Sequence, residues 1–207
     1  WSAPSNSKKD VFVTSSHKRY HLGTRMHLPG GRVFRFAKNG ASQISVGHLA
    51  QSPENDSRLA DVAVASVHQP GAETLTLTVA LSTVINLNDY EDGLVYINDG
   101  SGEGYVYPIR LNTESLATST TLLLYLDSGT QIVMTTSTKA TVIQNRFKGT
   151  TLANTDPNEP ILGVAPVTVA ASQYYWLQTG GPCVALQDGT LYAYRPITYS
   201  NLVKCAL

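Results

Sequence analysis

The sequence has few of the features on which catalysis, membrane insertion or nucleic-acid binding depend. Only 14% of its 207 residues are charged and the formal net charge is zero, so no general electrostatic field favours a nucleic acid or an acidic membrane as a partner. No apolar run reaches the length of a membrane span, and the first residues lack the basic and apolar regions of a signal peptide. We expect a soluble chain that binds neither nucleic acid nor membrane.

Catalytic signatures are absent as well. The sequence contains no Gly-x-Ser-x-Gly motif, no zinc-ligand spacing and no phosphate-binding loop. Cys183 has no histidine nearby in the sequence. Cys183 and Cys205 could pair only if the C-terminal segment folds back over the hairpin, and we expect free, half-buried thiols. Two carboxylates brought together from distant strands would still permit a glycosidase. The prediction is nevertheless that the chain is not an enzyme and carries no cofactor.

Five histidines are candidate metal ligands. His17, His21 and His27 fall within eleven residues, but the composition around them is typical of strands, and no acidic or cysteine ligand lies nearby. His48 and His68 are isolated in the sequence. We therefore expect surface or hydrogen-bonded histidines and no metal.

A glycine-rich acidic loop is the other candidate for a metal site. Asp99 and Glu103 stand among three glycines, and hard cations such as calcium take carboxylate and carbonyl oxygens. The regular acidic positions of an EF-hand are missing, however. A solvated hairpin loop is therefore the preferred interpretation, with a calcium site as the alternative.

Short strands separated by turn residues dominate the chain. The clearest alternation puts Leu75, Leu77 and Val79 on one face of a strand and threonines on the other. Strands at about ten-residue spacing, with no convincing helical period, are typical of a β-sandwich or barrel. We expect an all-β fold with short antiparallel strands at Arg32 to Ala37, Ile44 to Val46, Leu94 to Ile97, Tyr105 to Leu111, Thr121 to Leu126, Ile132 to Thr136 and Ala140 to Gln144.

Three segments are expected. Residues 1–21 form an extended N-terminal arm that has too little apolar surface to fold alone and would be ordered by docking, on our hypothesis against a neighbouring subunit. Residues 22–153 form the main β domain. Residues 154–207 add a hairpin, Tyr174 to Gln178 against Cys183 to Gln187, and C-terminal strands that complete the same domain or a second small one.

Three stretches carry a resemblance to a known class of proteins. They read GRVFRFAKNGASQISVG, NDYEDGLVYINDGSGEGYVYPI and ILGVAPVTVAASQYYWLQTGGPCVAL. Together they resemble the capsid decoration (cement) and head-fibre-type structural proteins of tailed bacteriophages, over most of residues 22 to 195. Similar chains continue past the equivalent of Leu207 with another strand, and the missing strand would leave an open edge for a neighbour to cover. The most specific positions are Gly163, Val164, Ala165, Trp176, Gln178, Gly181 and Pro182.

The resemblance implies a virion protein on the outer capsid surface, assembled in the host cytoplasm. It implies a homotrimer at local threefold positions that links adjacent subunits of the major capsid protein. A receptor- or carbohydrate-binding module is the alternative, with Tyr174, Tyr175, Tyr192 and Tyr194 as its aromatic platform. The candidate capsid or subunit contacts are Trp1, Phe12, Lys18, Arg19, Tyr20 and Arg25.

Overall fold

The computed structural model describes residues 10–80, 82, 84–153 and 159–186, and over these residues the chain is all-β, as expected. They contain no α-helix and two single-turn 3-10 helices, η1 (Asp10–Phe12) and η2 (Ser57–Leu59). The chain divides into two compact units. Unit 1 consists of Trp1–Glu54 and Arg146–Leu207, and unit 2, Asn55–Asn145, is inserted between these two segments.

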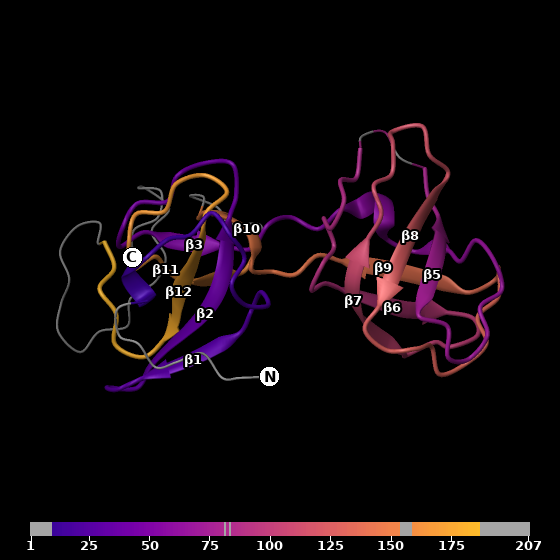
Figure 1. Cartoon of the computed structure of the whole chain (residues 1–207), viewed down its shortest axis with the longest axis horizontal. Helices are drawn as coiled ribbons and strands as arrows, with labels where there is room; N and C mark the ends of the chain where they lie inside the picture. Colours follow the sequence, from indigo (N-terminus) through magenta and orange to yellow (C-terminus); the bar gives the residue numbers. More distant parts are fainter. Residues whose placement is uncertain (1–9, 81, 83, 154–158, 187–207) are drawn as a thin grey trace. The chain divides into compact units, whose positions relative to one another are not determined.

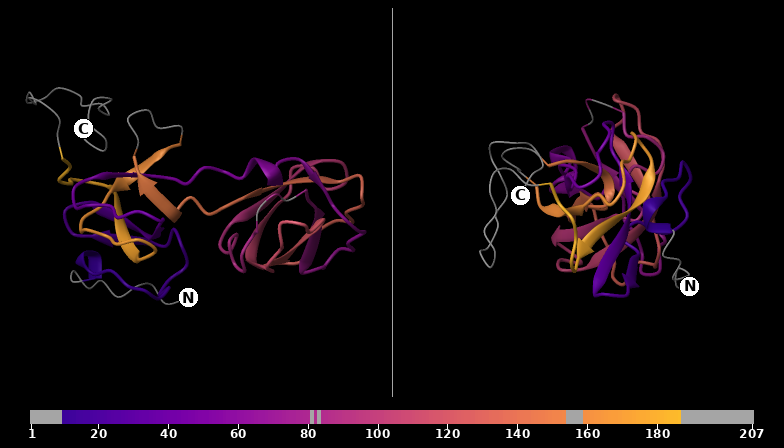
Figure 2. Two further views of the ribbon diagram at one scale, coloured as in Figure 1. Left: turned by 90° about the horizontal axis from the view of Figure 1, so that it is seen from above. Right: turned by 90° about the vertical axis from the view of Figure 1, so that its left-hand side faces the viewer.

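Unit 1 contains a closed barrel of five strands (Figures 1 and 2). Going round the barrel, the order is β2, β10, β3, β11, β12 and back to β2, while β1 pairs with β2 alone. The β2–β10 pair is parallel and the other pairs are antiparallel. The strands are β1 (Arg25–Leu28), β2 (Arg32–Asn39), β3 (Leu49–Gln51), β10 (Lys148–Leu152), β11 (Ile161–Val164) and β12 (Tyr174–Gly180).

Both faces of the β2–β12 pair are buried. Trp176 lies opposite Phe36 and Tyr175 opposite Ala37, so successive pairs point to opposite faces. On one face, the Tyr20 ring packs with its centroid 5.3 Å from that of Phe36 and 5.4 Å from that of Trp176. On the other face, Tyr175 is fully buried. The pair is therefore the centre of the core of unit 1.

The described part of the N-terminal segment docks on its own barrel. Val11 is 1% exposed and belongs to the core of unit 1. Ser15 and Tyr174 exchange two backbone hydrogen bonds, of 2.9 and 2.8 Å. Residues 10–20 thus make ordered contacts with the barrel of their own chain.

Unit 2 is a nearly closed barrel of six antiparallel strands. The order is β4, β9, β6, β7, β8 and β5, and a bridge between Val64 and Leu77 joins the two ends. Inward positions carry fully buried aliphatic side chains such as Leu75, Leu122 and Leu124. The strands are β4 (Val62–Ala63), β5 (Thr74–Thr78), β6 (Leu94–Asp99), β7 (Val106–Asn112), β8 (Thr121–Leu126) and β9 (Lys139–Ile143).

One small structural element recurs in both barrels. A buried residue makes an isolated antiparallel bridge, a four-residue turn closed by an N–H···O=C bond of 2.9 to 3.4 Å follows at once, and a strand comes next. The bridges pair these elements two by two through reciprocal hydrogen bonds of 2.8 to 3.0 Å. The pairs among the described residues are Ile44 with Val169, His68 with Met134, and Ile85 with Ser115.

The structure places several predicted strands correctly and one hairpin differently. The β6–β7 hairpin and strand β8 occur where the sequence predicts them, but the predicted strands around Ile44 and Met134 are single bridges. The predicted pairing of Tyr174–Gln178 with the segment from Cys183 is wrong, because β12 pairs with β2 and β11. Most of the break expected at Asn154 to Pro160 lies outside the described residues. The two compact units meet at 54/55 and 145/146.

Candidate functional site: an apolar groove on unit 1

Exposed apolar side chains gather around one groove of unit 1. Phe12 is 57% exposed, Val46 53%, Val184 85% and Leu186 45%. The groove has a volume of about 510 Å³. Exposed apolar surface of this kind, concentrated in one place, is typical of an interaction site. The lining residues are Phe12, Arg32, Phe34, Val46, Gly47, Val164, Ala165, Pro166, Gln178, Pro182, Cys183, Val184 and Leu186.

Hydrogen bonds hold the rim of the groove in place. The Leu186 N–H donates to the Gly47 carbonyl at 2.9 Å, which ties the last described residue to the turn that carries Val46. The Gln178 side chain, itself largely buried, donates through Nε2 to the Pro182 carbonyl at 2.7 Å. Val46 and Leu186 are therefore presented on a backbone that hydrogen bonds restrain, which lowers the entropy cost of binding.

The predicted contact residues do not form a single cluster. Phe12 lines the apolar groove, and Trp1 lies outside the described residues. Arg19 is exposed and Lys18 is half-buried, and neither lines this groove. Of these four residues, the structure thus supports Phe12 as a groove residue.

Tyr20 and Arg25 have other surroundings. Tyr20 is half-buried between Phe36 and Trp176, so it is a packing residue of unit 1 and offers little surface to a partner. Arg25 is exposed on β1 and lines a different pocket from Phe12. The sequence did not predict the residues that join Phe12 in the groove, because Val46 and Val184 are far from it in the chain.

The two units carry opposite charge. Unit 1 contains twelve Lys and Arg against five Asp and Glu, a formal charge of +7. Unit 2 contains three Lys and Arg against ten Asp and Glu, a formal charge of −7. The neutral total therefore hides two fields of opposite sign, and each unit attracts partners of opposite charge over about one Debye length.

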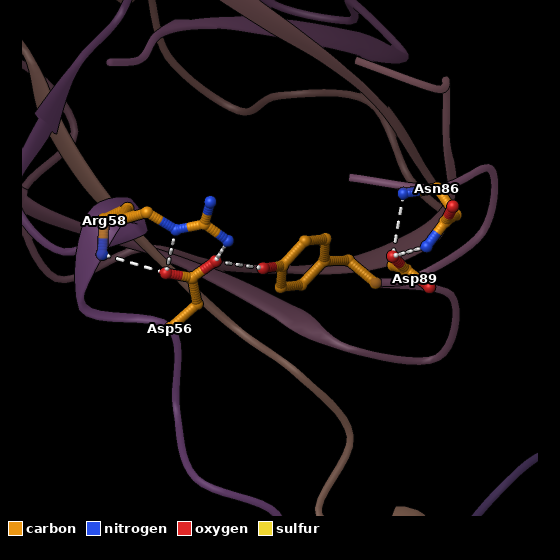
Figure 3. Close-up of polar contacts among 5 residues, drawn as sticks. Asp56, Arg58, Asn86 and Asp89 are labelled. Carbon is orange, nitrogen blue, oxygen red and sulfur yellow. Dashed lines mark hydrogen bonds and ion pairs between the residues drawn. The ribbon is translucent and has the colours of Figure 1, made fainter. Parts of the chain in front are cut away.

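A polar cluster stabilises the beginning of unit 2 (Figure 3). The Asp56 carboxylate caps η2 by accepting the Arg58 N–H at 3.0 Å and forms a two-pronged ion pair with the Arg58 guanidinium. The Tyr90 hydroxyl donates to Asp56 Oδ2 at 3.1 Å. Nearby, Asp89 accepts from the backbone and side-chain N–H groups of Asn86 at 2.8 and 3.1 Å. Both carboxylates in Figure 3 thus accept hydrogen bonds from the protein itself.

The same contacts shift the pKa values of two groups. The hydrogen bond from the Arg58 side chain lowers the pKa of Asp56, because it stabilises the charged form. Burial, followed by the charge of Asp56, raises the pKa of Tyr90. These shifts keep the carboxylate charged and the phenol neutral over a wide pH range. The cluster is therefore a structural contact.

His68 and the acidic loop show ordinary hydrogen bonding. His68 is largely buried, its Nε2 accepts the Thr76 N–H at 3.3 Å, and burial lowers its pKa. At the end of β6, Asp99 Oδ1 accepts the Gly100 N–H at 2.8 Å. Within the described ranges, no three His, Cys, Asp or Glu side chains are grouped so that they could hold a metal ion.

Two further predictions concern the cysteines and the aromatic platform. Cys183 is a free thiol, but it is exposed and not half-buried, and Cys205 lies outside the described residues. Tyr175 is fully buried, so it is not available to stack on a sugar. Tyr174 is half-buried and stacks on Phe36 at a centroid distance of 5.7 Å. Tyr192 and Tyr194 lie outside the described residues.

The part of the chain that the structure describes contains no helix with the length and apolar character of a membrane span. Searches of known protein families, curated proteins and solved structures find no match to this chain.

Proposed function

We propose that this chain is a capsid decoration protein that binds the outer surface of a phage head and links adjacent subunits of the major capsid protein. The observation that carries the proposal is the groove with Phe12, Val46, Val184 and Leu186 on a restrained surface of unit 1. The resemblance of residues 22 to 195 to phage decoration proteins suggests the major capsid protein as the partner. Assembly as a homotrimer on the virion surface belongs to the same proposal.

A binding role of this kind needs anchors and repetition. Stable protein interfaces bury about 800 Å² on each partner, and a few apolar side chains near the centre supply most of the affinity. An oligomer that touches several capsid subunits gains further from effective concentration. The groove side chains provide the anchors, and a ring of copies would provide the repetition.

The test is decoration of heads. Purified protein is mixed with undecorated heads of the same virus, and electron microscopy should show added density on the outer surface at local threefold positions. The absence of added density at saturating, folded protein would refute the proposal.

A matched pair of variants connects this result to the groove. Val46→Asp places a charge inside the groove, and Val13→Asp places one at a residue of similar exposure, 49% against 53%, that does not line it. We expect Val46→Asp to weaken head binding at least about tenfold, the size of a hot-spot loss, and Val13→Asp to bind nearly as wild type. Equal binding by both variants would exclude the groove as the contact.

A further inference from the structure

A second pocket of unit 1 lies at one end of the barrel. Strands β2 and β11 begin there and β12 ends there, and the pocket has a volume of about 350 Å³. It shares no lining residue with the apolar groove. The lining residues are Arg25, Val33, Arg35, Arg146, Phe147, Pro160, Ile161, Leu162, Thr179 and Gly180.

Three arginines from three separate segments meet at this pocket. Arg25 on β1 is the direct cross-strand partner of Arg35 on β2, so their side chains lie on the same face. Arg146 comes from the other end of the sequence of unit 1, immediately before Phe147. Like charges placed directly opposite each other in a ladder destabilise the sheet. The Arg25–Arg35 pair therefore lowers the stability of the β1–β2 hairpin.

No described acidic side chain pairs with these arginines, Arg25, Arg35 and Arg146. Glu159 adjoins the pocket residue Pro160 in the sequence, but it does not line the pocket, and its carboxylate accepts the Ser52 hydroxyl at 3.2 Å. Among the residues that the structure describes, the pocket therefore presents positive charge without an acidic side chain in its lining.

The guanidinium group of Arg35 is restrained by two contacts. One of its terminal nitrogens donates to the Gly23 carbonyl at 2.8 Å, and its guanidinium carbon lies 5.5 Å from the centre of the Phe147 ring. Four of its five N–H groups are left for other acceptors. A restrained guanidinium loses less entropy when it forms a paired hydrogen bond with a carboxylate or phosphate.

We propose that Arg25, Arg35 and Arg146 form a binding site for an oxyanion, a carboxylate or phosphate group on a small ligand. The oxyanion lies among the guanidinium groups, and the body of the ligand contacts Phe147 and Ile161. Bound anion screens the repulsion between Arg25 and Arg35, and the +7 charge of unit 1 raises the local anion concentration. The site is independent of the proposed capsid role.

The experiment is calorimetric titration of the full chain in a low-salt buffer with inorganic phosphate, with citrate and with an acidic hexapeptide. We expect saturable binding of at least one probe. A preference for phosphate assigns a phosphorylated ligand, and a preference for citrate or the peptide assigns a carboxylate ligand. Arg25→Glu and Arg146→Gln should each weaken that binding at least about tenfold.

Arg32→Gln is the matched control. Arg32 lies on the same strand as Arg35 and over a ring in the same way, 5.8 Å from the Phe34 centroid, but it does not line the pocket. This variant should keep the affinity of the wild type. No saturable binding of any probe, or equal affinity in wild type and Arg25→Glu, would overturn the proposal.

Stability provides the second readout. Arg25→Glu replaces a like-charge pair by an opposite-charge pair across β1 and β2, so it should raise the melting temperature of the ligand-free protein by about 1 to 4 °C. Ligand should raise the melting temperature of the wild type and leave that of the variant unchanged. A variant that is more stable and no longer binds is the signature of a binding site. A ligand-induced shift of equal size in both proteins would contradict it.

Discussion

Closure of the barrel of unit 1 depends on two strands approaching each other at Gly163. Val164 on β11 pairs with Gln178 on β12, and this pairing closes the ring. A Cβ atom at position 163 would collide with the backbone carbonyl oxygen of Gln178. Because this oxygen belongs to the backbone, it cannot rotate away as a side chain could. Gly163→Ala must therefore separate the two strands or deform them.

The cost can be placed within a range. Overpacking of a well-packed region destabilises proteins by about 1 to 3 kcal/mol, and backbone against backbone belongs at the upper end. We expect a loss of about 3 kcal/mol, equivalent to a fall in melting temperature of about 10 °C for a unit of this size. Gly180→Ala is the control, since its Cβ would meet the Val33 side chain at an ordinary 3.5 Å.

Both tryptophans, Trp1 and Trp176, belong to unit 1, so tryptophan fluorescence during urea unfolding reports on this unit alone. The urea midpoint for Gly163→Ala should fall well below that of the wild type. The free energy of unfolding for Gly180→Ala should stay within about 0.5 kcal/mol of the wild-type value. Equal midpoints for the two variants would refute the argument that close approach of the strands requires glycine at position 163.

Two other predictions concern stability. Tyr20→Ala removes a ring packed on Phe36 and Trp176 and should destabilise unit 1 by about 2 kcal/mol, whereas Phe12→Ala, at an exposed ring, should change the urea midpoint little; similar losses for both would contradict the packing role of Tyr20. Because the pKa of Asp56 is lowered in the folded state, its contribution is complete above about pH 4 and is lost as the pH falls through the folded-state pKa. In calorimetry of the full chain, Asp56→Asn should lower the free energy of unfolding of unit 2 by about 1 to 2 kcal/mol at pH 7 and by less at low pH. A loss that does not change with pH would contradict the lowered pKa of Asp56.

The sequence predicted the fold class and many strands because alternation records which face is buried. Leu75 and Leu77 are fully buried, as the alternation of this segment predicts. The element made of an isolated bridge and a four-residue turn produces no alternation of this kind in the sequence. Ile44, His68 and Ser115 occupy equivalent places, and since the bridges are made by backbone groups, the side chains are free to differ.

The candidate sites could not have been predicted from spacing. Both the groove and the arginine pocket contain residues from segments more than 100 positions apart. Unit 2 lies between these segments in the sequence, and the fold of unit 1 brings them together. The charge separation is present in the composition, but it becomes visible only when the boundaries at 54/55 and 145/146 are known. The hairpin from Tyr174 was wrong for the same reason, since its true partner, β2, is distant in the sequence.

The strand pairing of unit 1 also bears on how the proposed partners could be bound. An open sheet edge would invite a strand from a neighbour, but the five-strand ring has no free edge, since each of its strands is paired on both sides. Among the described strands of unit 1, β1 has one unpaired side; it is four residues long and exposes Arg25 and His27, features that discourage strand addition. Contacts through side chains, at the groove and at the arginine pocket, are therefore favoured over exchange of a strand.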